Sequence, residues 1–116
     1  MSERHEGSIF PAPICNLPRA DIALPGVKAY LSQAETYQIL FMEFEEDVKL
    51  PEHSHGAQWG VVLEGQIELV IDGVHHVFRK GDRYFIPEGV NHSGSIHAGY
   101  ADITWFGTKD RYRAKT

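Results

Sequence analysis

The sequence predicts an all-β protein built as one antiparallel sandwich or barrel. The chain has 116 residues, and its apolar residues fall in short runs rich in Val, Ile, Tyr, Phe and Trp. Gly, Pro, Asp or Asn bounds each run, as in strands joined by turns, and no window shows a sustained helical period. Strands spaced in this way close into a sandwich or barrel, and the length fits one core.

The N-terminal stretch is expected to be a lead-in to the barrel. Four prolines interrupt residues 1–25, which show little periodicity. We therefore expect an arm over 1–25, a barrel over 26–107 and a tail over 108–116. The arm could pack along its own barrel or wrap a partner subunit.

Eight strands are expected in the barrel. Asp72-Gly73 should form a two-residue hairpin loop, because both residues tolerate the positive φ angles that such a loop needs. The strands, in chain order, are 27–34, 37–46, 59–65, 66–71, 74–78, 83–87, 92–97 and 100–107.

The strand at 37–46 has two apolar faces. Leu40, Met42 and Phe44 alternate along it and should point into the barrel. An apolar outer face usually meets another sheet or another subunit, so we expect a homodimer. The outward positions are Tyr37, Ile39 and Phe41.

Charge and hydropathy exclude two classes of partner. The net charge is -5 with a pI near 5.7, and basic residues cluster only in KDRYRAK, 109–115, so no nucleic-acid partner is expected. No apolar stretch approaches the roughly 20 residues that span a bilayer, and the start, MSERHEGS, is too polar for a secretory signal. The only cysteine, Cys15, cannot form an intrachain disulfide. We expect a cytoplasmic protein without a membrane partner.

Two histidines stand one residue apart in PEHSHGAQWGVVLEG, 51–65. Alternate residues of an extended strand share a face, so His53 and His55 could reach one ion. The chain has seven histidines, and a pair of this kind arises easily by chance. Considered alone, the pair is more simply read as two solvated side chains after Pro51.

A second segment changes this interpretation. GDRYFIPEGVNH, 81–92, contains a Gly-Asp turn, a short aromatic strand, a Pro-x-Gly turn and then a histidine. Together with HSHGAQWGVVLEG, 53–65, it resembles the two motifs of the cupin superfamily, specifically a small single-domain cupin. The matching positions are His53, His55 and Gly65 in the first motif and Gly81, Pro87, Gly89 and His92 in the second.

The chain departs from the family pattern at three positions. Asp47 replaces the opening glycine of the first motif, and Ile96 replaces the final asparagine of the second. Gln58 stands where the family usually has glutamate, and only two residues separate it from His55.

The resemblance implies a jelly-roll β-barrel that binds one divalent metal ion per chain, either Mn, Fe, Ni, Co or Zn. A neutral ligand shell leaves the ion its full charge and makes it a stronger Lewis acid. Because imidazole must be deprotonated to bind, metal affinity should fall below about pH 6.5. The implied ligands are His53, His55, Gln58 and His92.

A neutral Gln58 cannot act as a general base, so base-dependent chemistry needs another group. Strand phase offers four candidates. Trp59 and Trp105 could line the mouth of the pocket, although core or interface packing is the simpler expectation for both. The other histidines are not expected to join the site. The base candidates are Gln38, Glu46, Arg83 and Tyr84, and the remaining histidines are His5, His75, His76 and His97.

Two functions are compatible with these features. The first is a small metalloenzyme that polarises an oxygen-rich small molecule, such as a sugar acid, keto acid or enol, for isomerase, lyase or dioxygenase chemistry. The second is a noncatalytic, metal-stabilised module that binds or senses a small ligand. A third alternative, a structural dimer that binds no metal, does not explain why His53, His55 and His92 would converge.

Overall fold

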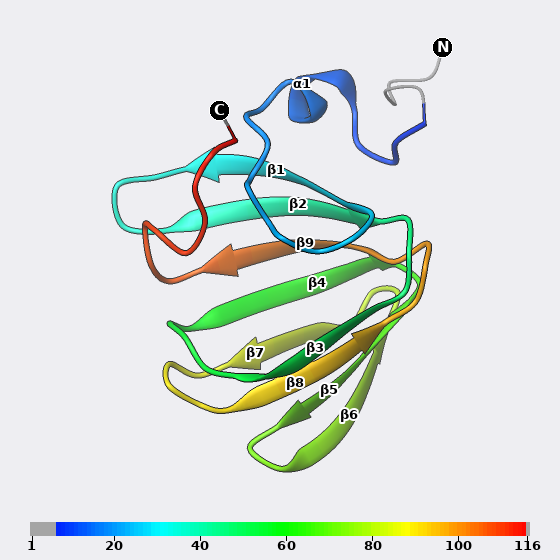
Figure 1. Cartoon of the computed structure of the whole chain (residues 1–116), viewed down its shortest axis with the longest axis vertical. Helices are drawn as coiled ribbons and strands as arrows, with labels where there is room; N and C mark the ends of the chain where they lie inside the picture. Colours follow the sequence, from blue (N-terminus) through cyan, green and yellow to red (C-terminus); the bar gives the residue numbers. More distant parts are fainter. Residues whose placement is uncertain (1–6, 116) are drawn as a thin grey trace.

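The computed structural model describes residues 7–115. Within them lie one short helix and nine strands (Figure 1). No helix in this range is long and apolar enough to cross a membrane. The elements are α1 Ala12–Cys15, β1 Val27–Gln33, β2 Gln38–Phe44, β3 Val48–His53, β4 Gln58–Glu64, β5 Gln66–Ile71, β6 Val74–Arg79, β7 Arg83–Ile86, β8 His92–Ile96 and β9 Ala101–Phe106.

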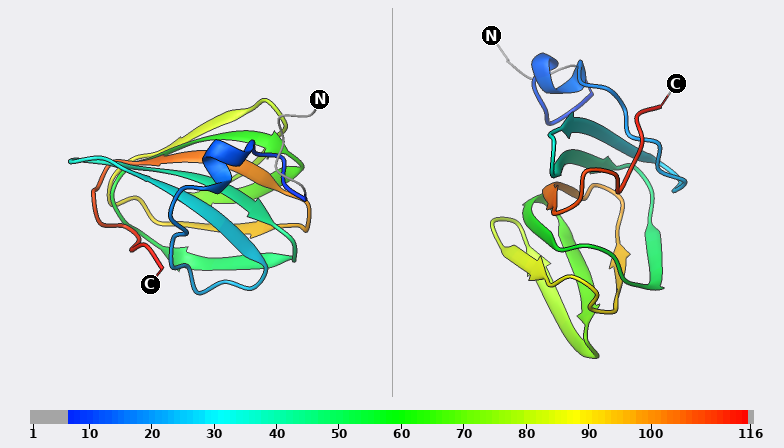
Figure 2. Two further views of the ribbon diagram at one scale, coloured as in Figure 1. Left: turned by 90° about the horizontal axis from the view of Figure 1, so that it is seen from above. Right: turned by 90° about the vertical axis from the view of Figure 1, so that its left-hand side faces the viewer.

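The strands form two antiparallel sheets that face each other. One sheet has the order β1-β2-β9-β4-β7 and the other β3-β8-β5-β6. Neighbouring strands are mostly distant in sequence, so the chain passes repeatedly between the two sheets, as the views in Figure 2 show. This is an all-β jelly roll, and the predicted fold class is confirmed.

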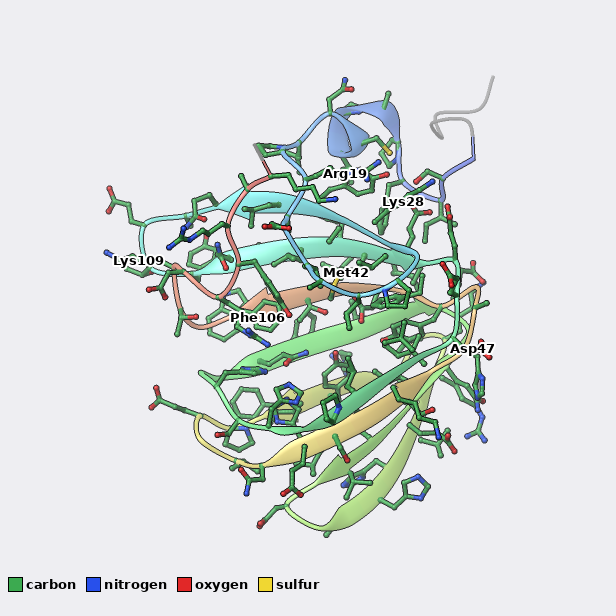
Figure 3. All side chains as sticks on the ribbon, viewed as in Figure 1. Arg19, Lys28, Met42, Asp47, Phe106 and Lys109 are labelled. Atoms are coloured by element: carbon green, nitrogen blue, oxygen red, sulfur yellow. The ribbon has the colours of Figure 1, made fainter. Side chains whose placement is uncertain are left out.

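The core lies between the sheets. The side chains of Leu40, Met42 and Phe44 are buried, so the predicted inward face of β2 is confirmed. Met42 and Phe106 both point into the space between the sheets (Figure 3). The outward residue Phe41 is only half-buried, although the ring of Phe10 from the arm packs edge-on against it at 5.7 Å.

The predicted Asp72-Gly73 turn joins β5 and β6. Asp72 has φ 49° and Gly73 has φ 78°, and Ile71 pairs with Val74 across the turn. Positive φ at both central residues matches the right-handed twist of the flanking strands.

The sequence did not predict β3. Pro51 lies within this strand and removes a backbone donor, which argues against an interior strand. The structure accommodates the proline because β3 is at the edge of its sheet. The strand ends at His53, so His55 lies in the connection to β4 rather than on the same strand.

The arm and the tail run together beside β1, where Figures 1 and 2 also place α1. Arg19 pairs with Tyr30 of β1, and Ala20 pairs with Ala114 of the tail. The side chains of Ile22 and Leu24 then pack against the barrel core. The arm thus packs along its own barrel and reaches the opening between the sheets.

Candidate metal centre

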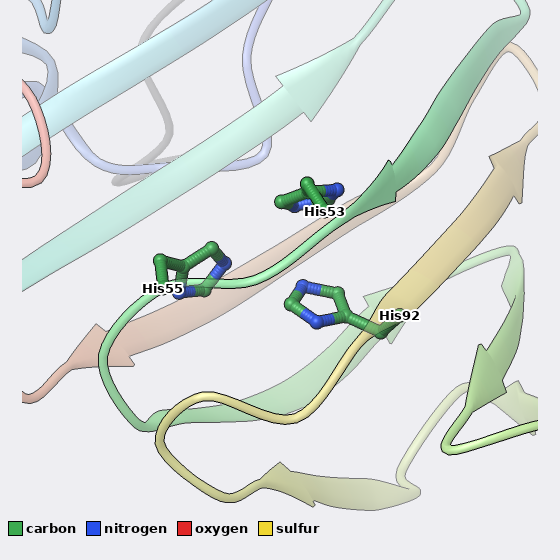
Figure 4. A group of neighbouring side chains, drawn as sticks. All are labelled: His53, His55 and His92. Carbon is green, nitrogen blue, oxygen red and sulfur yellow. The ribbon is translucent and has the colours of Figure 1, made fainter.

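Three histidine side chains converge between the sheets (Figure 4). His53 is the last residue of β3, and His92, the first residue of β8, is its register partner. His55 approaches from the β3–β4 connection. One ring nitrogen from each lies within 4.8 Å of the others, and the ring centroids are 4.2–5.2 Å apart. Three imidazoles at this spacing could hold one metal ion.

Backbone carbonyls fix the tautomer of each ring. His53 Nδ1 lies 2.7 Å from the carbonyl oxygen of Pro51, and His92 Nδ1 lies 3.0 Å from that of Val90. His55 Nδ1 makes the same contact with its neighbour's carbonyl at 2.7 Å. A carbonyl oxygen only accepts, so each Nδ1 must carry the proton and donate it. Each Nε2 therefore keeps a free lone pair, which is the state that binds a metal.

Burial keeps two of the three rings, His55 and His92, uncharged. Desolvation lowers the pKa of His55 to about 4 and also lowers the pKa of His92, and the positive charge of Arg111 acts in the same direction on both. These two rings are therefore neutral at pH 7 without any metal. At these two rings the proton competes with a metal only at a lower pH than at a free histidine, so their capacity to bind a metal extends below pH 6.5.

Gln58, the first residue of β4, lies on the wall of the same cavity. Its amide Nε2 donates a hydrogen bond of 3.2 Å to the hydroxyl of Tyr84. This bond occupies the nitrogen and leaves the amide oxygen free, which is the atom that a divalent ion would take. A set of three imidazoles and one amide oxygen fits the divalent ions that accept nitrogen and oxygen ligands.

The cluster opens into a cavity of about 360 Å³. Most of its walls are apolar side chains from both sheets, such as Met42, Leu69 and Ile86. The arm contributes Ile22 and Leu24, and the tail contributes Arg111 and Tyr112. A largely apolar pocket of this size with a few polar groups is typical of a small-molecule site.

Asp102 of β9 is a wall residue that the sequence reading missed. Its side chain is 2% exposed. The hydroxyls of Tyr100 and Thr104 donate hydrogen bonds of 2.7 and 3.0 Å to its two carboxylate oxygens. Burial nevertheless raises the pKa of Asp102 to about 7. The sequence does carry a signal for it, because Asp102 alternates with Thr104 and Phe106 and therefore shares their inward face.

The structure separates the four candidate bases. The prediction that Glu46 and Arg83 face the cavity was wrong, because both side chains are exposed. Glu46 lies beyond the end of β2, and Arg83 faces outward on β7. Gln38 is fully buried, but its amide binds the backbone of Tyr112 in the tail. Only Tyr84 lines the cavity, and burial raises its pKa, so its hydroxyl stays protonated.

The remaining aromatic and histidine residues lie elsewhere. Trp59 pairs with Trp105 on the outer face of the five-stranded sheet. His75 and His97 are exposed, and His76 stacks on the ring of Phe78. None of these three histidines joins the cluster, and His5 lies outside the described residues.

A glycine on β4 leaves room for Tyr84. A Cβ added to Gly60 would lie 2.4 Å from the Tyr84 ring. Gly60→Ala should therefore push Tyr84 away from Gln58 and lower the free energy of unfolding by about 1–3 kcal/mol. Urea unfolding measures this loss, and Gly60→Ala in a Tyr84→Leu background is the control, because the ring atoms that the added Cβ would meet are then absent. Equal stability of Gly60→Ala and the wild type would contradict the packing described here.

The comparisons with known proteins agree with this architecture. Residues 40–106 match the family model described as Cupin domain. An RmlC-like cupin from Shewanella frigidimarina is 24% identical, with a TM-score of 0.69 over 81% of this chain and 86% of that one. KdgF from Halomonas sp. is 18% identical, with a TM-score of 0.67 over 78% and 87% of the two chains. No curated protein matches the chain significantly.

A further similar structure is an oxalate decarboxylase from Bacillus subtilis that contains Mn(II) centres. It is 17% identical, with a TM-score of 0.66 over 84% of this chain but only 29% of that chain. At these identities the structural matches show the fold alone. The family match covers more than half of the chain and includes all three clustered histidines. This chain is therefore a member of the cupin domain family.

Proposed function

We propose that the protein is a metal-dependent enzyme that acts on an oxygen-rich small molecule, such as a sugar acid, a keto acid or an enol. One observation carries the proposal: three imidazoles, each held with Nε2 unprotonated, face a cavity that is large enough for a small substrate. His53, His55, His92 and the amide oxygen of Gln58 would hold one divalent ion. Among the similar structures, the oxalate decarboxylase with Mn(II) centres supports the choice of a metalloenzyme.

A bound divalent ion supplies Lewis acidity, which polarises a carbonyl, carboxylate or hydroxyl oxygen of the substrate. The chain supplies the proton transfer. Asp102 has a pKa near 7 and lies on the cavity wall, so it can give or accept a proton at neutral pH. Tyr100 and Thr104 hold its carboxylate in place through their hydroxyls. The apolar walls keep bulk water away from this group.

The alternative is a noncatalytic module that binds or senses a small ligand at the same site. It would need the metal and the cavity but no proton-transfer group. The buried acid with a raised pKa favours the enzyme, because burying such a group is costly and the core does not need it.

The test is an NMR screen for conversion. The wild type, loaded separately with Mn, Fe, Co, Ni or Zn, is incubated with a panel of sugar acids, keto acids and enols. We expect at least one compound to be converted, with the conversion lost in His92→Ala and slowed about 10²–10⁴-fold in Asp102→Asn. Compounds that bind but stay unchanged with every metal would establish the binding module and contradict the enzyme.

We also propose that the protein is a homodimer that buries the outer face of the five-stranded sheet. Ile39, Trp105, Trp59 and Phe85 are register neighbours across β2, β9, β4 and β7 and form one apolar row. Trp59 is 38% exposed and Phe85 is 54% exposed. A row of this kind is expected to be covered in solution.

Phe85→Glu should disrupt this dimer, because a charge buried in an apolar interface cannot be solvated. Sedimentation velocity should show a dimeric wild type and a dimer dissociation constant raised by about 30-fold or more in the variant. Val74→Glu is the matched control, since Val74 is 56% exposed on the other sheet. A monomeric wild type, or a Phe85→Glu variant that dimerises as well as Val74→Glu, would contradict the proposal.

A further inference from the structure

The tail places one arginine in the cavity. Arg111 lies five residues beyond the end of β9 and lines the cavity together with all three clustered histidines. Among the described residues that line it, Asp102 is the only carboxylic acid and Arg111 is the only arginine or lysine. The sequence alone indicates only a basic cluster in the tail, because nothing in KDRYRAK shows that one of its side chains turns inward.

The guanidinium group of Arg111 lacks an anionic partner. Its Nε is fully buried and makes no hydrogen bond. Over residues 7–115 the ion pairs involve Lys28, Lys80 and His97, and none involves Arg111. A buried guanidinium donor without an acceptor costs free energy and is expected to have a role that supplies the acceptor.

Several contacts hold this arginine in place. Its guanidinium carbon lies 4.6 Å from the centroid of the Tyr112 ring, and Tyr112 packs edge-on against Phe106 at 5.7 Å. Phe106 in turn packs against the ring of His55 at 5.7 Å. The rings of Tyr112, Phe106 and His55 thus connect Arg111 to the histidine cluster through successive contacts. Packing therefore sets the position of Arg111 relative to that cluster.

Gln38 fixes the backbone of the same segment. Its amide Nε2 donates to the carbonyl oxygen of Tyr112 at 2.8 Å, and its Oε1 accepts from the backbone N–H of Tyr112 at 3.1 Å. Gln38 is fully buried, so this clamp is shielded from water. The tail is thus attached to β2 at the residue next to Arg111, which preorganises the arginine for a ligand.

We infer that Arg111 binds the carboxylate of the substrate, and that the protein acts on small carboxylic acids. This inference rests on the proposed function and names its substrate class. A planar guanidinium presents paired N–H donors that match the two oxygens of a carboxylate. Such a ligand would supply the acceptor that Nε lacks, while its other oxygens face the histidine cluster.

A carboxylate fits the site better than a phosphate does. The cavity offers one arginine, and its other walls are mostly apolar. A phosphate carries a greater charge and more acceptor oxygens than one guanidinium can satisfy. A carboxylate needs only one cationic partner.

The test measures ligand binding with and without metal. Sugar acids and keto acids, each paired with its neutral amide, are titrated into the wild type and followed by the ¹H–¹⁵N signal of Arg111 Nε–Hε. Inorganic phosphate and a sugar phosphate form a further arm. We expect at least one acid to shift this signal and to bind more tightly than its amide and than the phosphates. Arg111→Gln should weaken that acid about 10- to 100-fold and leave the amide unaffected.

Two variants complete the experiment. Arg113→Gln is the matched control, because Arg113 is exposed in the same tail and does not line the cavity. Arg111→Lys keeps the charge but loses the planar pair of donors, so it should recover only part of the affinity. The inference is overturned if acids bind no better than amides, if a phosphate binds best, or if Arg111→Gln binds acids as the wild type does.

Metal content, measured by mass spectrometry, separates this inference from the proposed function. A wild type that takes up no metal refutes the metalloenzyme, and the Nε–Hε titration of the metal-free protein still decides the role of Arg111. An Arg111→Gln variant that binds metal normally but has lost its preference for acids supports both. Circular dichroism checks that each variant is folded.

Discussion

His92→Ala is expected to lower the affinity for a divalent metal by more than about 100-fold. Loss of an outer-shell partner of a metal ligand already costs about 10- to 100-fold, and here a ligand itself is removed. His92 is the best-buried of the three histidines, with 3% of its side chain exposed, so water cannot easily take its place. Isothermal titration calorimetry of the metal-free protein measures the change.

The loss of metal affinity in His92→Ala should also appear in the free energy of unfolding measured with metal present. An ion present at 1,000 times its dissociation constant stabilises the folded wild type by about 4 kcal/mol, and His92→Ala should lose most of this gain. The comparison is made within each variant, with and without metal, so that any effect of the substitution on packing cancels. His75→Ala is the matched control, because His75 is exposed on β6 and lies outside the cluster. Equal metal affinity of His92→Ala and His75→Ala would contradict the assignment of His92 as a metal ligand.

Asp102→Asn is expected to change how stability depends on pH. The unfolded carboxyl loses its proton near pH 4, whereas burial in the folded state raises the pKa to about 7. Between these values the folded state holds more protons, so each rise in pH destabilises the wild type through this group. Asparagine does not titrate. The free energy of unfolding of the wild type, relative to the variant, should therefore fall by about 3 kcal/mol from pH 4 to pH 7.

Urea unfolding of both proteins at several pH values, with chelator present, measures this difference. The other titrating groups, including His55 and His92, are common to both proteins, so their contributions cancel in the difference between the two free energies of unfolding. Asp110→Asn is the control, since Asp110 is exposed in the tail and its removal should leave the pH dependence of the wild type unchanged. A constant difference between wild type and Asp102→Asn across this range would show that Asp102 titrates as a solvated carboxyl does.

Local sequence patterns predict much of the fold and the histidine cluster. The alternation of β2, the Asp72-Gly73 turn and the short spaced strands each follow from rules that depend on neighbouring residues. His53 and His92 are 39 positions apart in sequence, and only the resemblance to the cupin motifs connects them before the structure does. Their register pairing across β3 and β8 then brings the rings together.

The features that the sequence did not reveal depend on contacts between distant segments. The β3 strand contains a proline that only an edge position allows, and the edge is a property of the whole sheet. Asp102 is buried because β9 is the middle strand of one sheet and its inward face is covered by the other sheet. Arg111 enters the cavity because Gln38, 73 positions earlier, holds the adjacent backbone. Neither Asp102 nor Arg111 belongs to a motif, and the residues beside them in the sequence do not indicate that they face the cavity.

X-ray absorption spectroscopy of the zinc-loaded protein tests the metal centre most directly. Imidazole rings give a multiple-scattering pattern that reports how many of them bind the ion. We expect one ion per chain with three imidazole nitrogens at about 2.0–2.1 Å and the remaining ligands oxygen. A spectrum with oxygen ligands alone, or with one imidazole per ion, would contradict a centre formed by His53, His55 and His92.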